Sequence, residues 1–375
     1  MQYTPQRLEK VHRAMEREEI ETLLITRTQD VYYLTGYQAP KNYLPTACLV
    51  HQGQVPLLLI SDLQREALRQ DSIMGEVRSF NPDTNDTWYP SHSRSFWNHI
   101  AETMKLTGTD SGMIGFQQES LSVRDFEEMK SVLPNAGFKD FSSVIWRLRQ
   151  VKDAAELDMI TQAVKIAEIG VRTALEIVST EKSESDVSIE IESAMRSVGG
   201  QLRGIRAAVL SGAGARFPFS QPGPNRIRSD EIVVIDITVS YNGYFAEIAR
   251  AVHLGNPTKS QRTLYQDSLN LCQSLEAKIS AGITLDDLIK QVSSQMRKGF
   301  SNERVVYPLG SSIGLDLREP PHIIPGSANS LRAGMVLSIH PTCYEKGVGS
   351  TKVADILHVT DDGCENLTSL ARDTM

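Results

Sequence analysis

The chain has 375 residues, of which 40% are hydrophobic and 23% are charged, and its formal net charge is −7. This acidic balance argues against non-specific nucleic-acid binding, which needs clustered lysine and arginine to displace counterions. The longest apolar runs, such as VPLLLI, are far shorter than the roughly 18 residues that span a bilayer. The polar N-terminus does not resemble a secretory signal, and the four cysteines show no paired spacing. We therefore expect a cytoplasmic protein with no membrane partner.

The first part of the chain, residues 1–145, is predicted to form a small α/β domain. Thr4 and Pro5 are typical of a helix start, because an N-cap threonine precedes proline at the first helical position. A β-hairpin is predicted where two apolar runs meet at Gly53. Ser122, with an acidic residue three positions later, fits the N-cap of a further helix.

The rest of the chain, residues 146–375, is predicted to form a larger α+β domain. Apolar residues recur every three or four positions in its first part, which indicates long helices. The predicted helices are 153–178, 184–198, 259–281 and 285–299, and the predicted strands are 205–211, 232–240, 244–253, 334–340 and 352–360. We expect a helical connection between the domains near residues 142–152.

The stretch EIVVIDITVSYNGYFAEIARAVHLG predicts a β-hairpin that carries two carboxylates on one face. Asn242-Gly243 between β-rich runs is typical of a type I′ turn, which needs positive φ at both central residues. Thr238 then faces Glu247, and Asp236 is a diagonal neighbour of Glu247. Such a pair can ligate a metal, divide acid and base roles, or hold a cationic substrate. The alternative is a surface hairpin with solvated carboxylates, but apolar residues on both faces indicate burial.

Six ordered segments resemble the landmarks of the creatinase/prolidase/aminopeptidase P family. They are DVYYLTGY, RLRQVKDAAELDMITQAVKIAE, VVIDITVSYNGYFAEIARAVHLG, GSSIGLDLREPP, LRAGMVLSIHP and VADILHVTDDGCENLT. The resemblance implies a creatinase-type N-terminal α/β domain followed by a pita-bread domain, in which two α+β halves surround a central site. It also implies a homodimer, with Tyr37 and the loop after it reaching the partner's site.

Peptidases of this family hold two divalent metal ions with two Asp, one His and two Glu, and this sequence keeps only part of that set. Asp236 stands at the place of the first Asp, and Glu247 replaces the second. Ser311 stands at the place of the His, His340 at that of one Glu, and Ala354 at that of the bridging Glu. A hydroxyl and a methyl group are poor substitutes for an imidazole and a carboxylate. We therefore expect no metal cofactor, with a three-ligand site of Asp236, Glu247 and His340 as the alternative.

Creatinase hydrolyses a C–N bond without metal, and the chain resembles it in GLDLRE and GMVLS. The catalytic His of creatinase falls at or beside Phe219, whose ring cannot carry a proton. We therefore predict that His340, oriented by Glu247 or Asp236, activates water as the acid–base residue. The alternative is that His340 is only a hydrogen-bonded core residue.

Several polar and aromatic residues are predicted to contact a small-molecule substrate. Ser311 is expected to hydrogen-bond it. Arg318 takes a position where family peptidases carry a substrate-contacting His, and a guanidinium can clamp a carboxylate with two hydrogen bonds. Arg216 is a second candidate, and Phe219 is expected to supply an apolar wall. The alternative for both arginines is a salt bridge to a carboxylate of the Arg318 loop.

The predicted function is metal-independent hydrolysis of a C–N bond in a small carboxylate-bearing amidino or cyclic amino-acid-type compound. The second hypothesis is a catalytically inactive member that binds a ligand or partner, and the third is a mononuclear metal-dependent Xaa-Pro peptidase. The retained Asp, Glu, His and Arg favour the first over the second, because a decayed site tends to fill with apolar residues.

Overall fold

The computed structural model describes residues 5–39, 45–65, 68, 75–81, 94–201, 204–212, 215, 220–294, 300 and 302–375. The chain divides into two compact units, Met1–Arg149 and Gln150–Met375. The break falls after residue 149, inside the 142–152 stretch where a helical connection was expected, and helix α6 (Ser142–Gln150) occupies that stretch. No helix of the described residues is long and apolar enough to cross a membrane.

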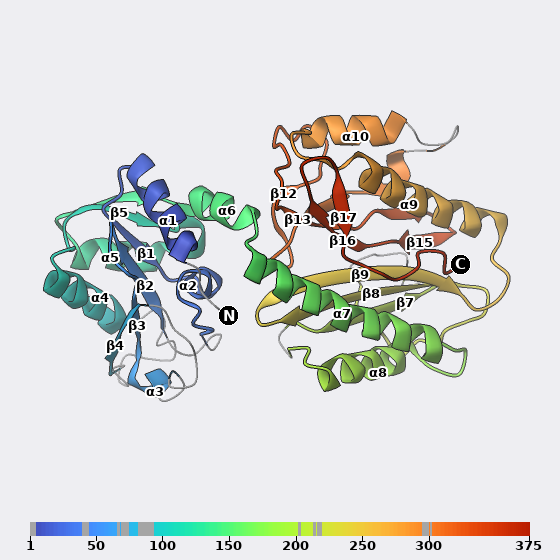
Figure 1. Cartoon of the computed structure of the whole chain (residues 1–375). Coiled ribbons are helices and arrows are strands. Elements are labelled where there is room, and N and C mark those ends of the chain that lie inside the picture. The colour runs from blue at the N-terminus through green and yellow to red at the C-terminus, as the bar shows by residue number, and fades with distance from the viewer. Residues whose placement is uncertain are drawn as a thin grey trace. The chain divides into compact units, whose positions relative to one another are not determined.

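The first unit contains a six-stranded sheet in the order β4-β3-β2-β1-β5-β6 (Figure 1). Its strands are β1 (Thr22–Ile25), β2 (Ala47–His51), β3 (Leu57–Ser61), β4 (Glu76–Phe80), β5 (Gly112–Phe116) and β6 (Ala136–Asp140). Its helices are α1 (Pro5–Arg17), α2 (Thr28–Thr35), α3 (Asp62–Arg65), α4 (Arg94–Thr107), α5 (Val123–Val132), α6 and the 3-10 helix η3 (Gln118–Ser120). The predicted hairpin is confirmed as the antiparallel pair β2-β3, and Ser122 is confirmed as the cap of α5, because its side chain accepts from the backbone N–H of Asp125.

The second unit contains three sheets, with the strand orders β7-β8-β9, β12-β11-β13-β16-β17 and β10-β14-β15. The strands before residue 330 are β7 (Arg206–Ser211), β8 (Ile232–Tyr241), β9 (Tyr244–His253), β10 (Val305–Val306), β11 (Gly310–Ser312) and β12 (Glu319–His322). Those after it are β13 (Val336–Ile339), β14 (Thr342–Glu345), β15 (Gly349–Lys352), β16 (Asp355–Val359) and β17 (Cys364–Asn366).

The helices of this unit are α7 (Ala154–Ile177), α8 (Glu184–Ser197), α9 (Lys259–Lys278), α10 (Leu285–Ser294) and the 3-10 helix η5 (Asn302–Arg304). In Figure 1, α7 and α8 lie on one side of β7-β8-β9, and strands β13, β15 and β16 lie on its other side. Strands β15 and β16 pack directly against β9. The unit is therefore layered, and the inner face of the β8-β9 ribbon is covered by the C-terminal strands.

Capping boxes fix the starts of three long helices close to where the sequence predicts them. Asp153, Ser183 and Thr258 each accept a hydrogen bond from the backbone three residues on, and the side chain at that position hydrogen-bonds back. Each box satisfies two backbone N–H groups that have no partner inside the helix. The helices at 154–177, 184–197 and 259–278 therefore confirm the predicted starts.

The predicted hairpin is confirmed residue by residue. Asn242 and Gly243 have φ angles of 45° and 82°, as a type I′ turn requires. Glu247 pairs with Thr238, and Asp236 pairs with Ala249. Both faces of the ribbon are buried, which excludes the alternative of a solvated surface hairpin.

The sequence misplaces the last strands before the C-terminus. The predicted strand 352–360 is divided, because β15 ends at Lys352 and β16 begins at Asp355. Strand β15 pairs instead with β14 in a hairpin, whose turn contains Gly347 with a φ of 84°. Lys352 therefore lies at the end of a separate strand, against the β8-β9 ribbon.

Candidate functional site

Two carboxylates of the β8-β9 ribbon form the base of the candidate site. Asp236 is 4% exposed and Glu247 is 1% exposed. Ala249, which pairs with Asp236, also exchanges two backbone hydrogen bonds with Ala354 at the start of β16. This bridge brings the segment just before β16 onto the face that carries both carboxylates.

Lys352 lies between the two carboxylates. Its Nζ is 2.9 Å from Asp236 Oδ2 and 2.8 Å from Glu247 Oε1. The side chain is buried, and it comes from the end of β15, two residues before Ala354. Lys352 was not predicted from the sequence. The signal for it was a lysine two residues before Ala354, the position of the lost bridging carboxylate, in an otherwise apolar and hydroxyl-bearing segment.

Arg318 and Ser338 complete the surroundings of Glu247. Arg318 Nη2 lies 2.6 Å from Glu247 Oε1, and Ser338 Oγ donates to Glu247 Oε2 at 2.5 Å. Arg318 was predicted to bind a substrate carboxylate or an acid of its own loop, whereas its ion pair is with Glu247. Its side chain remains one-third exposed, and its Nη1 donates to the backbone carbonyl of Leu317. Asp236 receives a further ion pair from Arg206 at 3.3 Å.

The charges of this cluster hold one another ionised. Burial alone would raise the pKa of Glu247, but Lys352 and Arg318 outweigh burial and hold that pKa well below its ordinary value. Burial alone would lower the pKa of Lys352, but Asp236 and Glu247 outweigh it and raise that pKa. The same attraction to Glu247 raises the pKa of Arg318 against the effect of burial. The site therefore contains two anions and at least two cations in contact.

His340 follows β13 and is 6% exposed. Its backbone N–H donates to Leu309, but its Nε2 has no hydrogen-bond partner among the described residues. Burial lowers the pKa of His340 to about 3, and the nearby Arg318 and Lys352 add to this effect while Glu247 opposes it. The predicted hydrogen bond from His340 to Asp236 or Glu247 is not found in the described part of the chain. Lys352, Arg318 and Ser338 take the Glu247 oxygens instead.

Ser311 lies on the same face of the sheet as His340. Ser311 pairs with Ser338 across β11 and β13, and His340 is two residues beyond Ser338, so the pleat directs all three side chains to one face. Ser311 Oγ is buried and, within the described ranges, has no hydrogen-bond partner.

Three buried polar atoms of this region thus have no hydrogen-bond partner among the described residues: Asp236 Oδ1, Ser311 Oγ and His340 Nε2. Leaving a buried polar atom unpaired costs about 1–3 kcal/mol. All three belong to residues that the sequence predicted for the site, and buried polar atoms of folded proteins are rarely left without a partner.

The remaining predicted residues are not brought into this group. Tyr37 is buried in the first unit, where its backbone N–H donates to Thr35 Oγ1, and its role at a partner's site stays a prediction, as does the homodimer. Arg216 and Phe219 lie outside the described residues.

A second buried lysine lies near the candidate site. Lys152 Nζ is 3.1 Å from Glu319 Oε2 and 3.2 Å from Ser312 Oγ. Glu319 therefore pairs with Lys152 and not with Arg318. Lys152 and Lys352 have similar burial, but Lys352 contacts two carboxylates.

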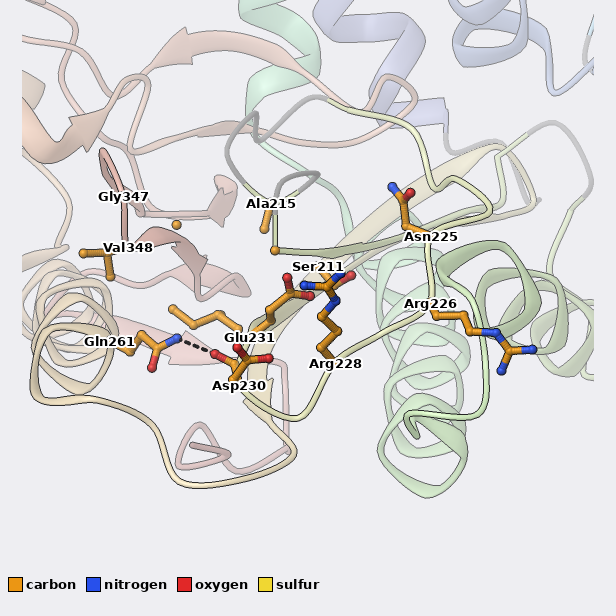
Figure 2. A pocket seen from close by; sticks show the side chains of 13 residues that line it. Ser211, Ala215, Asn225, Arg226, Arg228, Asp230, Glu231, Gln261, Gly347 and Val348 are labelled. Atoms are coloured by element: carbon orange, nitrogen blue, oxygen red, sulfur yellow. Dashed lines mark hydrogen bonds between the residues drawn. The ribbon is translucent and has the colours of Figure 1, made fainter.

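A separate cavity of about 510 Å³ lies at the start of β8 (Figure 2). Ser211, Arg228, Glu231 and Gln261 are among its lining residues. Gln261 donates to the backbone carbonyl of Asp230, the contact drawn as a dashed line in Figure 2. None of the lining residues is Asp236, Glu247 or Lys352, and among the described residues none carries an unpaired buried polar atom. We therefore assign no site to this cavity.

The donor groups do not fit the divalent metals that the family resemblance implies. No cluster of three or more His, Cys, Asp and Glu side chains in the described ranges could hold a metal ion. Asp236 and Glu247 are both engaged by the Lys352 ammonium, and Ala354 and Ser311 offer neither carboxylate nor imidazole. Divalent ions need several such ligands in a fixed geometry.

Comparison with known proteins gives matches along nearly the whole chain. The family description "Creatinase/Prolidase N-terminal domain" matches residues 7–151, and "Metallopeptidase family M24" matches residues 158–361. An Xaa-Pro dipeptidase of Pyrococcus furiosus is 26% identical over 373 residues, 99% of each chain. An Xaa-Pro dipeptidase of Lactobacillus helveticus is 25% identical over 98% of this chain and 97% of its own. The crystal structure of the prolidase from Pyrococcus horikoshii OT3 superposes with a TM-score of 0.85 at 23% identity, over 99% of this chain and 100% of that one.

Proposed function

The chain belongs to metallopeptidase family M24 and carries a creatinase/prolidase N-terminal domain, and from this premise we propose that it hydrolyses the C–N bond of a small Xaa-Pro-type compound without a divalent metal. The predicted fold, a creatinase-type N-terminal α/β domain followed by a pita-bread domain, is confirmed. The names of the relatives support proline-containing dipeptides over the amidino compounds that the sequence also allowed. This substrate belongs to the third hypothesis from the sequence, the Xaa-Pro peptidase, whereas the metal independence of the proposal comes from the first.

The observation that carries the proposal is the set of three unpaired buried atoms, Asp236 Oδ1, Ser311 Oγ and His340 Nε2. Asp236 Oδ1 and a neutral His340 Nε2 accept hydrogen bonds, and the Ser311 hydroxyl can donate or accept. A ligand with a protonated amino group supplies the matching donors. Arg318, whose side chain is one-third exposed, supplies a cation for a carboxylate. A zwitterionic dipeptide carries both groups.

His340 is the proposed proton carrier. Its low pKa, set mainly by burial, keeps the imidazole neutral at pH 7, so that Nε2 offers a lone pair. In the proposed reaction Nε2 takes a proton from water while the water oxygen bonds to the substrate's carbonyl carbon. The C–N bond then breaks, and the same proton passes to the leaving nitrogen. Lys352 and Arg318 favour this step because their positive charges stabilise the oxygen that becomes negative.

A second candidate is ligand binding without turnover. The observation that favours it is the strength of the existing ion pairs, because Lys352 and Arg318 already neutralise Glu247. An imidazole with a pKa of about 3 is also a weak base. On this reading the same cluster binds a dipeptide-like ligand and leaves it intact.

The test is to incubate extensively dialysed protein with Xaa-Pro dipeptides in the presence of EDTA and to measure released proline by mass spectrometry. Pro-Xaa dipeptides and creatine are the comparison substrates. We expect proline release that His340→Ala abolishes and that His322→Ala, which changes an exposed histidine of β12, leaves intact.

Each other outcome has a defined meaning. Thermal stabilisation by a dipeptide without any release supports the binding protein and contradicts the hydrolase. Release that requires added Mn²⁺ or Zn²⁺ and stops with EDTA contradicts metal independence and supports the metal-dependent Xaa-Pro peptidase. Release that His340→Ala does not change removes His340 from the mechanism.

A further inference from the structure

We infer that Lys352 is a built-in cation that takes the place of a metal ion between Asp236 and Glu247 and excludes divalent ions from this position. The inference extends the metal-independent part of the proposed function, but it concerns ion binding and not turnover. It therefore holds equally for a hydrolase and for a ligand-binding protein.

The geometry gives the first argument. Nζ of Lys352 contacts Asp236 Oδ2 at 2.9 Å and Glu247 Oε1 at 2.8 Å. Metal ions bind carboxylate oxygens at about 2.0–2.2 Å. An ion that bridged these two oxygens would compete with the ammonium group for the same place.

The charge balance gives the second argument. Asp236 and Glu247 supply two negative charges, and Lys352, Arg318 and Arg206 supply three positive charges in ion pairs with them. A divalent ion would add two positive charges to a group of side chains whose two carboxylates are already matched by at least as many cations. Uncompensated charge in a buried place is strongly unfavourable.

The fold gives the third argument, because it holds Lys352 in position. Ala354 exchanges two backbone hydrogen bonds with Ala249, and Lys352 itself pairs with Thr342 across β14 and β15. The backbone that carries the lysine is therefore fixed on both sides of the short break between β15 and β16. The ammonium is a permanent part of this site and not a mobile surface group.

Lys152 provides a matched control. It is also buried and also forms an ion pair, with Glu319 at 3.1 Å, but its other side-chain contact among the described residues is the hydroxyl of Ser312. Removing Lys152 takes this ammonium group from only one carboxylate, that of Glu319. Removing Lys352 takes the shared cation from two carboxylates, the minimum for a chelating pair, although Arg318 still contacts Glu247 and Arg206 still contacts Asp236.

The experiment is equilibrium dialysis of metal-free full-length protein against Mn²⁺ or Zn²⁺, followed by elemental analysis, with wild type, Lys352→Ala, Lys152→Ala and Lys352→Arg. We expect no stoichiometric uptake by wild type, Lys152→Ala or Lys352→Arg. For Lys352→Ala we expect affinity to increase by roughly tenfold or more, together with an upward shift of its melting temperature when metal is added. If Lys352→Ala folds only when metal is present, that result also supports the inference.

Stoichiometric Mn²⁺ or Zn²⁺ in the wild type overturns the inference. So does a folded Lys352→Ala that binds metal no better than Lys152→Ala. If Lys352→Ala does not fold under any condition, the wild type and Lys352→Arg decide, because uptake by either shows that a cationic side chain does not exclude the ions. No substrate is present, so failure of the proposed hydrolysis leaves these results unaffected.

Discussion

Lys352 on β15 and Glu247 on β9 form a buried ion pair, 2.8 Å long, between residues 105 positions apart in the chain. The pair joins the β8-β9 ribbon to the C-terminal strands. It also keeps both groups charged, since the pKa of Glu247 is lowered and that of Lys352 is raised. The stability of the unit and the chemistry of the site therefore depend on the same contact.

The first prediction concerns removal of the lysine charge. Lys352→Met keeps much of the side-chain volume but leaves Asp236 and Glu247 facing each other without their shared cation. Breaking one side of a buried ion pair costs about 3–5 kcal/mol, and we expect a loss of this size in the free energy of unfolding. Urea denaturation at pH 7 measures it.

Lys290→Met is the control for this change, because Lys290 forms an exposed ion pair with Asp286 one helical turn away. Exposed pairs contribute little to stability, so its unfolding midpoint should match that of wild type. If Lys352→Met has the same urea unfolding midpoint as wild type, the ammonium group does not stabilise the fold.

The second prediction concerns acid stability. The pKa of Glu247 is well below 4.5 in the folded chain, so the unfolded chain binds a proton at higher pH than the folded chain does. Its contribution to stability is present above pH 4.5 and is lost as the pH falls through the folded pKa. Glu247→Gln should be less stable than wild type at pH 7, and the difference should shrink as the pH falls below 4.5.

Urea midpoints between pH 3 and pH 7 test this expectation. Glu16→Gln, which changes an exposed glutamate, is the control and should follow the wild-type profile. A constant difference between Glu247→Gln and wild type over the whole range would mean that the carboxylate is not held ionised by its neighbours.

The third prediction concerns the protonation of His340. Burial lowers its pKa from 6.5 to about 3, so the neutral ring should persist at pH 5, where a solvated imidazole is mostly charged. Ring nitrogen chemical shifts in ¹⁵N NMR report this directly, and the His340→Gln spectrum identifies the signal. A midpoint near 6.5 would show that the ring is solvated, and it would weaken the case for an unpaired buried Nε2.

The sequence predicted the parts of the site that depend on local pattern. The Asn242-Gly243 turn fixes the register of β8 and β9, so the placement of Asp236 and Glu247 follows from two residues. Lys352 could not be placed in the same way. Its position depends on the end of β15, on the bridge between Ala249 and Ala354 and on packing against β9. These are long-range contacts without a local signal.

The partner of Arg318 was missed for a related reason. Within its own loop the nearby acids Asp316 and Glu319 are the obvious candidates, and sequence distance favours them. In the fold, Lys152 takes Glu319, and Arg318 reaches Glu247 on a different sheet. Which buried charges pair is decided by which groups the sheets bring together. Residues that are adjacent in sequence predict helix starts and hairpin turns, but they do not predict these pairs.

The last prediction concerns ligand binding by Arg318. Arg318→Gln removes this partly exposed cation, while Glu247 keeps its contacts with Lys352 and Ser338, so we expect the fold to survive. A hydrogen bond to a charged group contributes about 1.5–3 kcal/mol, which corresponds to a loss of dipeptide affinity of roughly tenfold to a hundredfold.

Calorimetric titration with an Xaa-Pro dipeptide, and with its C-terminal amide, separates the two roles of Arg318. If Arg318 binds the carboxylate, the variant should bind dipeptide and amide equally weakly, whereas wild type should prefer the dipeptide. An unchanged preference in Arg318→Gln would assign Arg318 to the Glu247 ion pair alone. The exposed Arg332→Gln should behave as wild type in both titrations.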